Sequence, residues 1–342
     1  MDTRARNGLL QSLLDGSCSC SDPKLLLSQE AWLRREALWA AALDWCLRSG
    51  RSLEAECRSE HLEAVGWELR IRATLQEIGQ AADRRGIQIL AFKGCALSLR
   101  YYLHPGQRSY GDIDLAVRSE DRAGFEELLF ELHFSPPVGT AYYREGLALD
   151  LHTHPLHQLG LDLCLGNEPW WQNLERLPCE YGALSVLRPE QEFILALFHG
   201  AKHAFSRGNW VADLWLLSRR QDPKALAEAV TRRRAGRHLW LAQQCLRAWF
   251  GADFPVEVQR SGKPAHRFDA FSHALLSLIL KRQAPDFLGM LTPLWALKGV
   301  KARWSYFWRA LSPAPGEHLA QKMRRLVTAL VDIHPDELPG SK

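Results

Sequence analysis

The sequence predicts an α+β protein, in which a small mixed sheet with flanking helices lies between an N-terminal and a C-terminal helical region. Three observations predict this class. Apolar residues recur at spacings of three and four before residue 86 and after residue 188, which is typical of amphipathic helices. Between these regions, short apolar runs alternate with helical segments. The 342 residues, 46% hydrophobic and 24% charged, suit two or three domains of ordinary soluble composition.

The region 1–86 is predicted to be helical. Two amphipathic segments, 23–50 and 60–86, end at Gly50 and Gly86, and glycine is the residue most often found just after a helix.

The pattern changes in the region 87–187, which we expect to form the α/β core. Short apolar runs at 87–92 and 112–117 predict buried strands. The segment 146–154 alternates leucines with other residues, as a strand does. Helices are expected at 95–104 and at 119–134, the second with Ser119 as its cap. The core should therefore hold three to five strands.

The region 188–342 is predicted to return to helices. Proline or glycine bounds most of the periodic segments. They cover 189–206, 209–220, 223–251, 267–283 and 317–334, and the tail after 334 is expected to fray.

Composition narrows the function. A net charge of +4 is too modest to indicate a nucleic-acid partner, and the basic run 231–238 is expected to be a solvated helix face or end. The longest apolar run is shorter than the ~18 residues of a membrane span, and the N-terminus lacks the apolar region of a signal peptide. The Trp-rich basic stretch 295–311 could contact a membrane or a partner, although packing into a core is the interpretation we favour.

The eight cysteines are scattered. Only Cys18 and Cys20 lie close together, and no second pair completes a zinc spacing. The cysteines predict free thiols and a cytoplasmic location.

Two aspartates on a predicted core strand suggest a metal site. Asp112 and Asp114 are two residues apart, so their side chains share one face of the strand while Ile113 points to the other. Two such carboxylates repel each other unless a cation compensates, and Mg²⁺ or Mn²⁺ is suited to oxygen ligands and phosphates. Asp150, on the later strand, could complete a two-metal site. The alternative is that Asp112 and Asp114 cap a helix or line a turn.

Five spaced elements occur in a recognisable order: Lys93-Gly94, Arg108, the run from Gly111 to Val117, Leu151-His152, and a helical segment with His199, His203 and Asp213. This set resembles a bacterial family of uncharacterised nucleotidyltransferases within the DNA polymerase β-type superfamily, over residues 87–217. The resemblance implies that the two-aspartate motif and a third aspartate bind metal, and that the glycine turn holds the triphosphate. Cys95 departs from the serine or glycine usual in that superfamily, and a thiol is a weak hydrogen-bond donor.

The resemblance implies roles for individual residues. Asp112, Asp114 and Asp150 are the expected catalytic and metal-binding residues, and Asp150 would also activate an acceptor hydroxyl. Nucleotide contacts are expected from Lys93, Gly94, Cys95, Arg108, Gly111, His152, His199 and His203. Arg108 could instead be a surface residue or pair with Asp112. His152 could share a metal with His154 or have a structural role, and His199 with His203 could form the far wall of the nucleotide cleft or a packed pair.

The function predicted from these features is Mg-dependent transfer of an NMP from an NTP to a hydroxyl of a small molecule, peptide or protein. One alternative is a non-catalytic nucleotide-binding or scaffold protein with a degenerate phosphate turn. Another is a nucleic-acid terminal transferase, which the lack of a long basic stripe disfavours. The base, the acceptor and the oligomeric state do not follow from the sequence.

Overall fold

The computed structural model describes residues 3–15, 23–155, 170–262 and 269–281, together with 292, 295, 303, 304 and 308. Within them the predicted class is confirmed: a six-stranded mixed sheet is combined with helices from both ends of the chain. The predicted helix 317–334, the tail, the Cys18–Cys20 pair and most of 295–311 lie outside the described residues.

The N-terminal region is helical, as predicted. Its helices are α1 (Thr3–Asp15), α2 (Pro23–Leu27), α3 (Glu30–Arg35), α4 (Trp39–Arg48) and α5 (Ala55–Arg84). The single helix expected at 23–50 is wrong, because the chain breaks into α2, α3 and α4. Ala37, between α3 and α4, has a φ of 55°, a left-handed conformation that no α-helix contains.

The sheet has the strand order β3-β4-β2-β1-β6-β5. Its strands are β1 (Ile89–Phe92), β2 (Asp112–Val117), β3 (Ala141–Arg144), β4 (Leu147–His152), β5 (Glu175–Arg176) and β6 (Leu184–Val186). The three strands predicted individually are confirmed, and the total exceeds the expected three to five. The last two strands have two and three residues, which is too short to show a period of two.

Two helices lie between the strands at the predicted places. They are α6 (Lys93–Tyr101) and, after the short turn η1 (Ser119–Asp121), α7 (Arg122–Glu131). The predicted cap is wrong: Ser119 lies inside η1, and no side-chain cap hydrogen bond forms there.

The C-terminal region is again helical. Its helices are α9 (Pro189–Lys202), α10 (Gly208–Arg220), α11 (Pro223–Arg232), α12 (Gly236–Phe250), α13 (Val256–Ser261) and α14 (Asp269–Lys281). The helix expected at 223–251 is broken near Arg234, which has a φ of 53°. The basic run 231–238 is therefore a solvated helix end only in its first half, because Arg237 and His238 are buried.

The two faces of the sheet have different partners. One face, which includes Ile113 and Leu149, packs against α5 and α7. The opposite face contributes Leu90, Phe92 and Ala116 to a second core formed mainly by helices. The edge of this face next to Phe92 carries the polar residues of β2 and β4, so it faces the helical half of the molecule.

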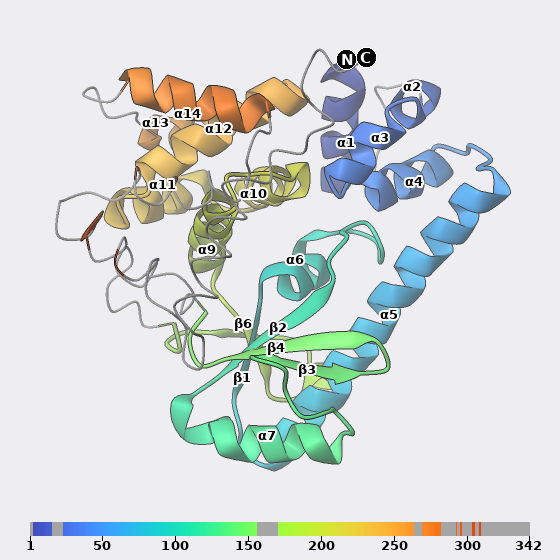
Figure 1. Cartoon of the computed structure of the whole chain (residues 1–342), viewed down its shortest axis with the longest axis vertical. Coiled ribbons are helices and arrows are strands. Elements are labelled where there is room, and N and C mark those ends of the chain that lie inside the picture. Colours follow the sequence, from blue (N-terminus) through green and yellow to red (C-terminus); the bar gives the residue numbers. More distant parts are fainter. Residues whose placement is uncertain are drawn as a thin grey trace.

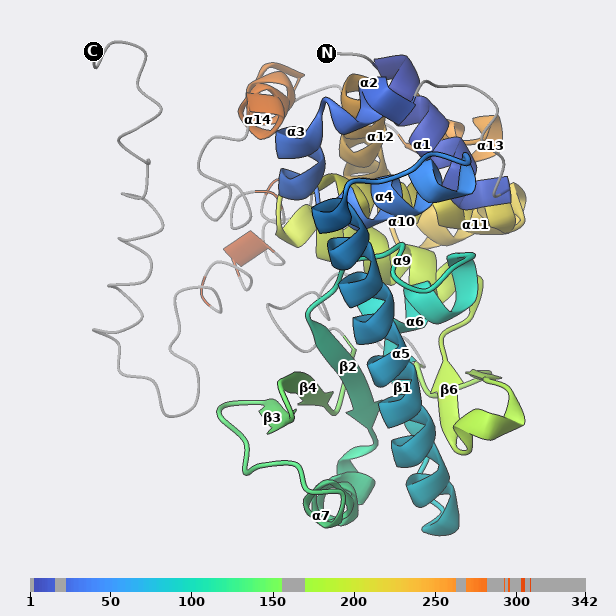
Figure 2. The same cartoon turned by 90° about the vertical axis from the view of Figure 1, so that its right-hand side faces the viewer.

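Helices from both ends of the chain form that half. Figure 1 shows the sheet and α7 in the lower part, with α1–α4 and α9–α14 together above, and Figure 2 shows α5 running along the sheet. Residues of α1, α4, α9, α10 and α12 share one core. Domain boundaries after residues 86 and 187 stay predictions, since α1–α4 pack with C-terminal helices while α5 packs with the sheet.

The expectations based on composition concern the tryptophans, the cysteines and membrane-spanning helices. Trp295 is buried beside Trp240, with ring centroids 6.2 Å apart, whereas Trp304 and Trp308 are more than half exposed. Among the described cysteines, Cys57, Cys95 and Cys179 are free thiols. No described helix combines the length and the apolar character needed to cross a membrane.

Candidate active site

The pairing of β2 with β4 brings the three predicted aspartates together. Asp112 and Asp114 share one face of β2, and Ile113 between them is fully buried on the other. The two strands are parallel, and Asp114 lies directly opposite Asp150. Residues far apart in the sequence therefore form one acidic group at the start of β2.

Asp114 is the buried centre of this group. Its carboxylate pairs with the Lys93 ammonium and lies 3.2 Å from Nε2 of His152. Burial would raise the pKa of Asp114, but the hydrogen bond from His152 and the charge of Lys93 outweigh it and lower the pKa. Asp114 is therefore ionised at neutral pH.

Asp112 has the opposite shift. Burial raises the pKa of its carboxyl, and the charges of Asp114 and Asp150 add to this effect. A carboxyl group whose ionisation is opposed by two neighbouring carboxylates favours the binding of a cation.

The donor atoms fit a divalent metal. One ligand atom each of Asp114, Asp150 and His152 lies within 4.8 Å of the others. Carboxylate oxygens suit Mg²⁺ and Mn²⁺, and an imidazole nitrogen suits Mn²⁺ better than Mg²⁺. His154 is not in this group: its ring lies edge-on to Trp170 at 6.0 Å. A metal shared by His152 and His154 therefore has no support, and His152 contacts Asp114 instead.

The turn between β1 and α6 lies next to the acidic group. Lys93 begins α6 with a φ of 57°, a conformation that is uncommon for a residue with a side chain. Gly94 is needed for a close approach, because a Cβ there would lie 2.9 Å from both Nη1 of Arg108 and Cβ of Tyr110. The turn is thus held against the loop that leads into β2, where Gly111 also lines the cleft.

The thiol of Cys95 points away from this turn. It is fully buried, 3.4 Å from the Phe92 carbonyl oxygen and 3.8 Å from that of Asp114. Burial, with the charge of Asp114, raises its pKa to about 12. The thiol therefore packs in the core and does not replace a serine hydroxyl as a donor to phosphate. Only the backbone N–H of Cys95 stays a predicted phosphate contact.

Arg108 is buried and pairs with Asp213. Its Nε and Nη2 donate to the two carboxylate oxygens at 2.9 and 2.7 Å. The Tyr102 hydroxyl donates to the same carboxylate at 2.7 Å. Both alternatives for Arg108, a surface position and a pair with Asp112, are wrong. Because Asp213 already compensates its charge, Arg108 mainly joins the loop before β2 to α10.

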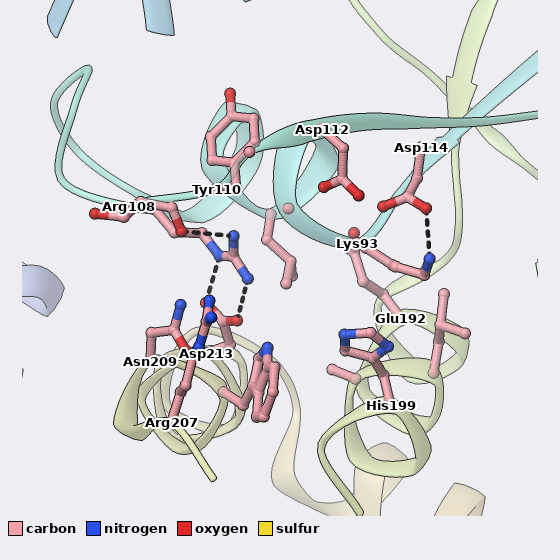
Figure 3. A pocket seen from close by; sticks show the side chains of 17 residues that line it. Lys93, Arg108, Tyr110, Asp112, Asp114, Glu192, His199, Arg207, Asn209 and Asp213 are labelled. Carbon is pink, nitrogen blue, oxygen red and sulfur yellow. Dashed lines mark hydrogen bonds and ion pairs between the residues drawn. The ribbon is translucent and has the colours of Figure 1, made fainter. Parts of the chain in front are cut away.

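The helices α9 and α10 form the opposite wall of the cleft. Figure 3 shows His199 facing the Lys93–Asp114 pair, with Arg207, Asn209 and Asp213 at the other end. Burial, with the charge of Lys93, holds the pKa of His199 well below its usual value. His203 is not part of the cleft lining, since its ring stacks on Trp210 at 5.0 Å.

The cleft opens between the loop before β2 and the helices α6, α9 and α10. Sequence reasoning missed several of its lining residues, namely Leu97, Glu192, Leu195, Asn209 and Trp210. These lie on three helices and carry no local motif, so only their meeting in space identifies them.

The sequence model of a family described as uncharacterised nucleotidyltransferases matches residues 31–251, about two-thirds of the chain. The chain belongs to this family. The match runs from α3 to the end of α12, so the nucleotidyltransferase family includes both walls of the cleft as well as the sheet. Comparison with curated proteins and with solved structures found no match.

Proposed function

We propose that this nucleotidyltransferase uses a divalent metal, Mg²⁺ or Mn²⁺, to transfer the NMP of an NTP to a hydroxyl on a small molecule, peptide or protein. The single observation that carries the proposal is the register of β2 and β4, which sets Asp150 opposite Asp114. Membership of the polymerase β-type superfamily is part of the same proposal.

The acidic residues have separate roles in this reaction. Asp112 and Asp114 would hold the metal beside the triphosphate, and the metal would supply charge neutralisation at the phosphates. Asp150 takes the proton of the acceptor hydroxyl, whose oxygen forms a bond to the α-phosphorus as pyrophosphate leaves. His152 orients Asp114 through its Nε2 contact.

The basic residues of the cleft complete the site. The Lys93 ammonium pairs with Asp114, and it would be available to a phosphate oxygen as a point charge if Asp114 held a metal ion instead. His199 faces the same space in its neutral form. Backbone N–H groups at the start of α6 add further phosphate contacts.

The test is a mass-shift screen. The protein is incubated with each NTP, Mg²⁺ or Mn²⁺, and candidate acceptors, with the chain itself among them. We expect an added NMP and an equal amount of pyrophosphate. Asp112→Asn and Asp114→Asn should abolish both, while Asp83→Asn, an exposed aspartate on α5, should not.

Other results would point to the alternatives. NTP binding without release of pyrophosphate under any acceptor would support a non-catalytic nucleotide-binding protein. Extension of an RNA or DNA primer would support a terminal transferase. Activity that survives Asp114→Asn would contradict the proposed roles of the aspartates.

A further inference from the structure

One end of the cleft holds a buried acceptor that lacks a hydrogen bond. Asn209 lines the cleft and is 4% exposed, and its Oδ1 has no hydrogen-bond partner among the described residues. An unsatisfied buried group of this kind destabilises the folded protein. The oxygen itself exposes almost no surface, so an N–H or O–H of a ligand in the cleft would pair with it after the amide rotates toward the cleft.

The first turn of α10 holds Asn209 in place. The buried carboxylate of Glu36 accepts the Gly208 N–H at 2.6 Å, and the Glu36 carbonyl oxygen accepts the Asn209 N–H at 3.0 Å. The Arg108 guanidinium lines the same end, but its N–H groups donate to Asp213 and to the Ser109 carbonyl oxygen. The fold thus positions the Asn209 amide, while the adjacent Arg108 guanidinium is already paired with Asp213 and Ser109.

Flat and apolar surface surrounds the amide. Trp210 lines the cleft next to Asn209, together with Leu97 and Leu195. The Trp210 ring stacks on His203, with ring centroids 5.0 Å apart and an interplanar angle of 29°. A rigid aromatic surface beside one hydrogen-bonding amide suits a nucleobase, which has a π-face and a polar edge.

The position of Asp150 separates the nucleotide from the acceptor. In the strand order β4 lies beyond β2, on the side away from β1, and Asp150 is not among the residues that line the cleft. An acceptor hydroxyl that gives its proton to Asp150 therefore approaches from the β4 side. The space between α6 and α10 is left for the rest of the NTP.

We propose that the Asn209–Trp210 end of the cleft binds the nucleobase of the NTP, with the Asn209 carboxamide oxygen accepting an N–H from the edge of the base. Asn209 is thereby a specificity residue. This inference rests on the proposed function, since it assumes that the carboxylate end holds the triphosphate.

The experiment measures binding without an acceptor. Isothermal titration calorimetry compares four α,β-methylene NTP analogues, one for each base, and inorganic pyrophosphate, all with Mg²⁺. The variants are Asn209→Leu and Asn209→Asp. The control is Gln243→Leu, which removes a buried amide of α12 outside the cleft lining. Its Oε1 likewise has no partner within the part of the chain that the structure describes.

We expect Asn209→Leu to weaken the preferred analogue about tenfold, the value of one hydrogen bond, without changing pyrophosphate binding. Asn209→Asp can only accept hydrogen bonds, so it should shift the preference toward guanine, which presents N1–H and N2–H side by side. A merely structural role would not change the ranking of bases.

The outcomes separate the two proposals. An unchanged ranking in both variants, or an equal loss for pyrophosphate, overturns the nucleobase site while NTP binding by the wild type stands. Wild-type protein that binds none of the analogues overturns the proposed function and this inference with it. Thermal unfolding of each variant confirms that the folded protein is compared.

Discussion

The buried ion pair between Arg108 and Asp213 allows a direct test of the architecture around the cleft. The two side chains are 6% and 2% exposed, and they join the loop before β2 to α10. Asp213→Ala leaves the guanidinium buried without its carboxylate and removes the acceptor of the Tyr102 hydroxyl. The loop and the helix should then separate, because the ion pair that joins them has gone.

The magnitude follows from the burial. Removing one partner of a buried pair costs about 3–5 kcal/mol, because an uncompensated charge remains. An unfolding entropy of about 2.1 cal/mol/K per residue, taken over 342 residues, converts this loss into a fall in Tm of about 4–7 °C. The double variant Arg108→Met/Asp213→Leu removes both charges, so it should lose less than Asp213→Ala alone.

The assay is urea denaturation of the single and double variants, with Arg34→Ala as a control for an exposed pair. Arg34 bonds Glu30 and Glu60 at the surface, where a pair contributes about 0–1 kcal/mol. If Asp213→Ala costs no more than Arg34→Ala, the pair is not desolvated as the structure has it. If the double variant is the least stable protein, the reasoning about charge is refuted.

Further predictions concern pH, thiol reactivity and the turn before α6. Burial and the charge of Arg237 lower the pKa of His238 to about 3, below the ordinary 6.5, so the unfolded state takes up the proton first and stability is lost as the pH falls. Between pH 7.5 and 4.5 the free energy of unfolding, measured by urea denaturation, should fall by about 3 kcal/mol less for His238→Leu than for wild type; equal losses would contradict this. With a pKa of about 12, Cys95 should resist iodoacetamide at pH 8 while the exposed Cys179 reacts. Peptide mass spectrometry measures the labelling of each cysteine, and equal labelling would contradict this prediction. Gly94→Ala, whose Cβ would meet two side-chain atoms at 2.9 Å, should cost about 1–3 kcal/mol, whereas Gly66→Ala, with nothing within 4 Å, should not destabilise the protein.

Local patterns in the sequence were sufficient for the strands that carry the aspartates. Alternation at 147–152 and the apolar run at 112–117 predict β4 and β2, because a strand with one buried face has a period of two. The same rule sets Asp112 and Asp114 on one face. Helix periodicity was less reliable at breaks: the chain turns near Ala37 and Arg234, which are good helix residues, because packing between helices outweighs propensity.

The residues that complete the cleft are not visible in local patterns. Asn209 depends on Glu36, which lies far away in the sequence and anchors the start of α10. The direction of the Cys95 thiol is hidden for a related reason, since the sequence places this residue in the turn but does not show toward which side its side chain points.

The amino-acid sequence by itself determined the class of fold, the acidic strand and the likeness to nucleotidyltransferases, because these follow from periodicities and motifs within short segments. The tertiary structure decided that Asp150 lies opposite Asp114, that Arg108 pairs with Asp213, and that helices from both ends share one core. These contacts depend on strand order and helix packing, whose energies come from surfaces that meet only after the chain has folded.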